Sequence, residues 1–144
     1  MMALSKDSIR LDYYATDWKD AVAEAGRLLV NAGLTTGQYI DGMIELVETH
    51  GAYMLVAPGV AMPHAQPAQG VMKTGISFLT LREPVEFPAK KENPITLLIG
   101  VAAENPDTHL DVIGNVAELI FEDASRLRLM QCKDPDEICR LVND

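Results

Sequence analysis

The chain has 144 residues, 48% of them apolar, and a formal net charge of −9. This length and apolar content predict a single globular domain over residues 1–144 with a core of its own. The negative charge, with no basic stripe interleaved with aromatic residues, argues against nucleic-acid binding. No apolar stretch is long enough to cross a bilayer, and Met1 to Arg10 lacks the pattern of a secretion signal. We therefore expect a cytosolic protein that does not insert into membranes.

The first third of the chain predicts two helices in succession. Apolar residues recur at helical spacing from Trp18 to Leu29, and Gly33 follows as a stop signal. A second helical pattern begins at once, opened by Thr35 or Thr36, and ends at Gly51.

The middle of the chain predicts the strands of a sheet. The turn residues from Arg82 to Pro84 separate two of these stretches, and the last stretch is the most apolar, as expected of a central strand. The expected strands are Tyr53 to Ala57, Val60 to Met62, Gly75 to Leu81, Val85 to Phe87, and Ile95 to Ala102.

The last third of the chain predicts helices again, so that the whole chain has an α/β pattern. A capping box of Thr108 and Asp111 opens a helix from Leu110 to Glu122. Two shorter helices are predicted after it, one around residues 125–131 and one opened by proline at position 135.

Several kinds of chemistry lack their sequence signals. Neither a GxGxxG nor a GxxxxGK[ST] loop is present, which argues against nucleotide binding, and the absence of GxSxG argues against a serine hydrolase. The three histidines are far apart, with no second ligand at helical spacing, so we expect no metal. Cys132 and Cys139 form no disulfide framework and are expected to be reduced and structural.

His64 and His109 are the best candidates for chemistry. Each follows an apolar run and turn residues, which predicts an imidazole at the edge of the sheet, where α/β proteins place reactive groups. A neutral imidazole is a competent nucleophile for phosphoryl transfer, and Pro63 restrains the backbone before His64. His109 is expected in the first turn of a helix, where the dipole favours an anion. We therefore expect the two imidazoles to come into contact.

Structural interpretations of the histidines remain open at this point. A histidine beside a proline is often a surface residue whose ring is bonded to a backbone carbonyl, and His109 taken alone is an ordinary first-turn residue. His50 ends the second predicted helix, where it most simply interacts with the negative end of the helix dipole.

Five segments of the sequence form an ordered set of motifs: Gly59 to Ala65, Lys73 to Gly75, Pro84 to Phe87, Pro94 to Ala103, and Thr108 to Leu110. Together they resemble the mannitol/fructose-type enzyme IIA domain of the bacterial phosphoenolpyruvate:sugar phosphotransferase system. Details around Pro58, Tyr53 and Phe87 are most similar to the ascorbate- and galactitol-like branch of that family. The resemblance implies a mixed, roughly five-stranded sheet flanked by helices, with no metal or nucleotide cofactor.

The resemblance also implies a function in sugar uptake. His64 would accept a phosphoryl group from the histidine phosphocarrier protein (HPr) and donate it to a cognate enzyme IIB, which acts with a membrane enzyme IIC. His109 would orient His64 and stabilise the phosphate. Ascorbate, galactitol or a pentitol is the sugar expected for this branch. A regulatory module of the nitrogen-related type and an inactive relative remain as alternatives.

Two positions depart from the family pattern. Relatives of this branch often carry arginine where this chain has Gln66, and many members carry arginine near the end of the second helix, close to His50. Gln66 and His50 are therefore the candidates for supporting the phosphate. Protonation of His50, slower transfer, or positive charge brought by the partner would each compensate for the missing arginines.

Overall fold

The computed structural model describes residues 4–51, 55–88 and 93–143. Within them a mixed five-stranded sheet has the order β1-β4-β5-β3-β2. The pairs β1 with β4 and β3 with β5 are parallel, whereas β4 with β5 and β2 with β3 are antiparallel. The strands are β1 (Ile9–Tyr13), β2 (Leu55–Ala57), β3 (Val60–Ala61), β4 (Gly75–Val85) and β5 (Ile95–Ala102).

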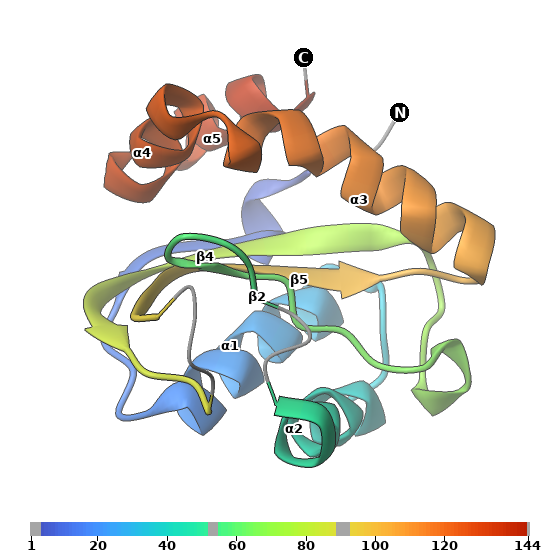
Figure 1. The fold of residues 1–144 in the computed structure, drawn as a ribbon. Helices are drawn as coiled ribbons and strands as arrows, with labels where there is room; N and C mark the ends of the chain where they lie inside the picture. Colours follow the sequence, from blue (N-terminus) through green and yellow to red (C-terminus); the bar gives the residue numbers. More distant parts are fainter. Residues whose placement is uncertain (1–3, 52–54, 89–92, 144) are drawn as a thin grey trace.

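Helices cover both faces of this sheet, which gives three layers (Figure 1). On one face lie α1 (Trp18–Asn31) and α2 (Gln38–His50). On the other face lie α3 (Pro106–Phe121), α4 (Asp123–Gln131) and α5 (Pro135–Asn143). The expectation of a mixed sheet flanked by helices is therefore confirmed.

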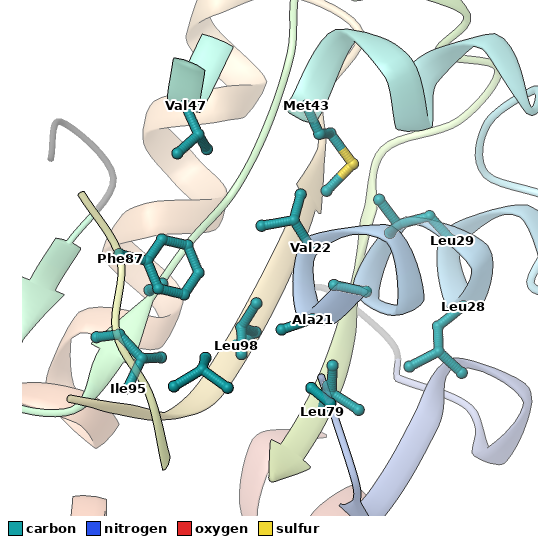
Figure 2. Close-up of a cluster of buried hydrophobic side chains, with 14 of the residues drawn as sticks. Ala21, Val22, Leu28, Leu29, Met43, Val47, Leu79, Phe87, Ile95 and Leu98 are labelled. Carbon is teal, nitrogen blue, oxygen red and sulfur yellow. The ribbon is translucent and has the colours of Figure 1, made fainter. Parts of the chain in front are cut away.

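Two apolar clusters hold the layers together, because alternate strand residues point to opposite faces. Leu79 and Leu98 face α1 and α2, where they pack with residues such as Val22 and Met43 (Figure 2). The neighbouring strand residues belong to the second cluster, with the helices of the other face. That cluster includes Phe78, Ile99, Val112, Val116, Ile120 and Ile138.

Two predicted boundaries differ from the structure in the central part of the chain. The helix α2 begins at Gln38, with Gly37 as its N-cap, rather than at Thr35 or Thr36, because Thr35 has extended backbone and forms an isolated β-bridge with Val71. The turn predicted at Pro84 is instead part of β4. The pairing of β4 with β5 is interrupted between Thr80 and Val85, so the missing N–H of proline is tolerated there.

The ends of the chain add two further corrections. Strand β1 was not predicted; it forms at the edge of the sheet by pairing with β4. The helix α3 begins at Pro106 instead of Leu110, because Asn105 is its N-cap and Thr108 is the third helical residue of the capping box. Tyr53, predicted to start a strand, lies outside the described residues.

Candidate functional site

The parallel pairing of β3 with β5 determines where the candidate site lies. Val60 pairs with Leu97 and Ala61 with Leu98, so the carboxyl ends of the two strands are at the same end of the sheet. The segment that leaves β3 carries His64, and the segment that leaves β5 leads into α3. The two meet around a hollow of about 370 Å³, lined by His64, Ala65, Gln66, Pro67, Ala103, Asn105, Pro106 and Leu110.

The imidazole of His64 has a defined orientation. Its Nδ1 lies 3.0 Å from the carbonyl oxygen of Met62. A carbonyl oxygen can only accept, so Nδ1 carries the hydrogen and donates it. In the neutral ring the lone pair is then on Nε2. The backbone-carbonyl contact expected of a structural histidine is thus present, and the same contact selects the ring nitrogen that can act as a nucleophile.

His109 is the fourth residue of α3, within the first turn of that helix. Asn105, Pro106 and Leu110, which surround it in sequence, line the same hollow as His64. The fold therefore brings the turn that carries His109 to the segment that carries His64. The side chain of His109 lies outside the described structure, so contact between the two imidazoles remains a prediction.

The amino end of α3 provides the favourable electrostatics of the hollow. Asn105 accepts a hydrogen bond from the Thr108 N–H at 2.9 Å and thereby caps the helix. The positive end of the helix dipole favours an anion here, although Asp107 adds a negative charge to the first turn. Sequence reasoning missed Asn105 as a site residue; an asparagine directly before a proline was the signal that could have revealed it.

The side chains that line the hollow are short of positive charge. None of the described lining residues is a lysine or an arginine. Gln66 does line the hollow, is exposed, and donates its backbone N–H to Oε1 of Gln69 at 3.0 Å. The amide groups of Gln66 and Asn105 are therefore the polar side chains beside His64 in the described lining.

His50 does not line the hollow. It is the last residue of α2, whereas Tyr39, near the start of that helix, contacts Ala65 beside His64. His50 is eleven positions after Tyr39 in the helix, about 16 Å along its axis. The structure therefore brings Gln66, but not His50, to the hollow with His64.

Within the described residues, neither a metal site nor a membrane-spanning helix is found. No group of three or more histidine, cysteine, aspartate or glutamate residues in that part of the chain could hold a metal ion. Nor is any helix found there with the length and apolarity needed to cross a membrane.

Comparisons with known proteins point to one family. The family model described as "Phosphoenolpyruvate-dependent sugar phosphotransferase system, EIIA 2" matches residues 2–144. An "Ascorbate-specific PTS system EIIA component" from Shigella boydii is 38% identical over 137 residues, which cover 94% of this chain and 89% of the relative. The protein of the same description from Salmonella choleraesuis is 38% identical over 138 residues, 95% of this chain and 90% of the relative.

Solved structures agree in fold. A putative PTS IIA from Streptococcus mutans superposes with a TM-score of 0.85 at 37% identity, covering 96% of this chain and 88% of that one. Enzyme IIAMTL of Escherichia coli, in its complex with phosphorylated enzyme IIBMTL, superposes with a TM-score of 0.86 at 25% identity, covering 99% of both chains. The nitrogen regulatory protein IIA-Ntr of Neisseria meningitidis has a TM-score of 0.77 at 25% identity, with 96% and 94% covered.

Proposed function

This chain belongs to the type 2 enzyme IIA family of the phosphoenolpyruvate-dependent sugar phosphotransferase system, and we propose that it carries the phosphoryl group on Nε2 of His64. The observation that carries this assignment is the bond from Nδ1–H to the Met62 carbonyl, 3.0 Å between nitrogen and oxygen. That bond leaves the lone pair of the neutral ring on Nε2. It also orients a ring that lines the hollow.

The transfer follows from this arrangement. The Nε2 lone pair attacks the phosphorus of a phosphohistidine on the donor and becomes the new N–P bond. The N–P bond to the donor breaks at the same time, and its electron pair returns to the donor ring nitrogen. The positive charge that develops on the His64 ring is stabilised because Nδ1–H still donates to Met62. Such transfers depend mainly on positioning and electrostatic stabilisation.

The partners follow from the family. We propose HPr as the donor and a cysteine or histidine of a cognate enzyme IIB as the acceptor, with enzyme IIC as the membrane component, so that the relay runs in the cytoplasm. The solved complex of an enzyme IIA with a phosphorylated enzyme IIB supports the acceptor. The relatives named as ascorbate-specific, 38% identical, favour ascorbate as the sugar of the system.

We further propose that the amino end of α3 stabilises the phosphate, with His109 as its donor and Gln66 beside it. The support is that Asn105, Pro106, Leu110 and Gln66 line one hollow with His64. His50 is not part of this proposal, because it lies at the other end of α2.

The test is phosphorylation of the purified protein with phosphoenolpyruvate, enzyme I and HPr. We expect mass spectrometry to detect one acid-labile phosphoryl group, and a heteronuclear nitrogen–phosphorus NMR spectrum to place it on Nε2 of His64. The His64→Ala variant should take up none, whereas the matched control His50→Ala should be phosphorylated like the parent. Full phosphorylation of His64→Ala would show that another residue is the acceptor.

A further inference from the structure

The hydroxyl group of Tyr39 lies at the junction between the His64 segment and β5. Tyr39 is 1% exposed. Its Oη is 2.9 Å from the Ala65 nitrogen and 2.7 Å from the Val101 carbonyl oxygen. The Ala65 N–H must donate to the hydroxyl, so the hydroxyl donates its single hydrogen to Val101, the nearest acceptor. A third contact, at 3.2 Å from the Ala65 carbonyl, is longer.

A second hydrogen bond ties the other side of the histidine to the same residue of β5. The Val101 N–H donates to the Pro63 carbonyl at 3.0 Å. Both polar groups of the Val101 main chain thus hold the residues that flank His64, one directly and one through Tyr39. Val101 pairs with Ile76 in the antiparallel ladder of β4 with β5, so these bonds tie the His64 segment to two interior strands of the sheet.

We propose that Tyr39 is a positioning residue for phosphoryl transfer: its hydroxyl holds the main chain after His64 so that the ring keeps its bond to Met62 and directs Nε2 into the hollow. The effect of Tyr39 on phosphoryl transfer rests on the function proposed for His64. The effect of Tyr39 on the orientation of the His64 ring does not depend on that function.

The environment of the hydroxyl suits this role. Burial raises the pKa of Tyr39 above its ordinary value, against a smaller lowering by the hydrogen bond from Ala65. The hydroxyl therefore remains a donor at neutral pH. A phenylalanine would fill the same space but would leave the Ala65 N–H and the Val101 carbonyl without this partner.

The experiment compares Tyr39→Phe with Thr80→Val, a variant that also loses one buried hydroxyl. Oγ1 of Thr80 accepts the Asp12 N–H at 2.9 Å. Thr80 pairs with Leu97, four residues before Val101 and about 13 Å away along β5. This control therefore removes a buried hydroxyl, with one hydrogen bond lost against at least two for Tyr39→Phe, without touching the His64 segment.

Two readouts are taken on each protein. The first is the tautomer of the unphosphorylated His64 ring, from nitrogen-15 NMR. We expect the Nδ1–H form in the parent and in Thr80→Val, and a mixture of both tautomers in Tyr39→Phe. The second is the rate of phosphoryl uptake from phosphorylated HPr, which should fall about tenfold or more in Tyr39→Phe alone, because small displacements of a reacting group are costly.

The outcomes separate the two proposals. If Tyr39→Phe keeps the Nδ1–H tautomer and matches Thr80→Val in rate, Tyr39 is structural only and the inference is wrong. If the parent takes up no phosphate while Tyr39→Phe still loses the Nδ1–H tautomer, the function of His64 fails and the positioning by Tyr39 stands. Should Tyr39→Phe not fold, the parent decides: an Ala65 amide that exchanges with solvent far faster than the amides of β5 would overturn the inference.

Discussion

Replacing Gln66 with arginine tests how the phosphate is held at a hollow without a lysine or arginine in its described lining. Gln66 lines the hollow with His64 and is exposed to solvent. A phosphorylated histidine carries close to two negative charges, and two unit charges about 4 Å apart in water attract by about 1 kcal/mol. The Coulomb gain is thus about 2 kcal/mol, and ordering the long side chain offsets part of it.

We therefore expect Gln66→Arg to favour phosphorylation by about 1 kcal/mol, or about fivefold in the equilibrium constant with HPr. The matched control is Gln131→Arg, which adds the same charge at an exposed position. Gln131 ends α4, which follows the far end of α3, a helix of 16 residues and about 24 Å. Both variants have the same net charge, so a general effect of charge on the encounter with HPr cancels.

The assay is the equilibrium fraction of phosphorylated protein at fixed ratios of phosphorylated to free HPr, at low salt and at about 1 M salt. The advantage of Gln66→Arg over Gln131→Arg should shrink at high salt, where the Debye length falls to about 3 Å. Equal equilibria for the two variants at low salt would show that position 66 points away from the phosphate and would refute the reasoning.

Three further predictions concern the rest of the site. His64→Ala should change the free energy of unfolding, measured by urea denaturation, by about 1 kcal/mol or less, because the ring is only half-buried and a hydrogen bond such as the one to the Met62 carbonyl contributes about 1 kcal/mol; a loss several times larger would make His64 a structural residue. His109→Ala should slow phosphoryl transfer in rapid-quench experiments without preventing it, and an unchanged rate would remove His109 from the mechanism. Asn105→Asp should keep the cap of α3 and the stability of the protein, since both side chains cap equally well, yet should disfavour phosphorylation by placing a carboxylate beside the phosphate; in contrast, Asn105→Ala should lose about 1 kcal/mol of stability.

Some residues of the candidate site could be predicted from the sequence, and others could not. His64 could be identified because Pro63 and the preceding strand are local signals, and the structure places it in a hollow with Gln66. Tyr39 could not be identified, since in the sequence it is one more buried residue of an amphipathic helix. Its role depends on the bonds to Ala65 and Val101, which are distant along the chain.

The helices and strands likewise differ in whether nearby residues or contacts distant along the chain determine them. A helix such as α1 is a local structure: its apolar stripe, the Asp17 cap and the positive φ of Gly33 act within a few turns, so the sequence by itself determined it. The five residues of β1 are too short to stand out, and their pairing with β4 makes them a strand. Pro84 indicated a turn, but the interruption in pairing opposite β5 let the strand continue.

The sequence by itself determined the α/β pattern and the most apolar strand, and it singled out His64 as the candidate nucleophile, because each depends on neighbours along the chain. Only the tertiary structure decided that the His64 segment and the amino end of α3 share a hollow, and that His50 does not reach it. The reason is the parallel pairing of β3 with β5, which brings the ends of two distant strands to the same end of the sheet. Which strands pair depends on the packing of the whole sheet between its helices. These contacts join residues distant along the chain, so a local sequence pattern does not predict them.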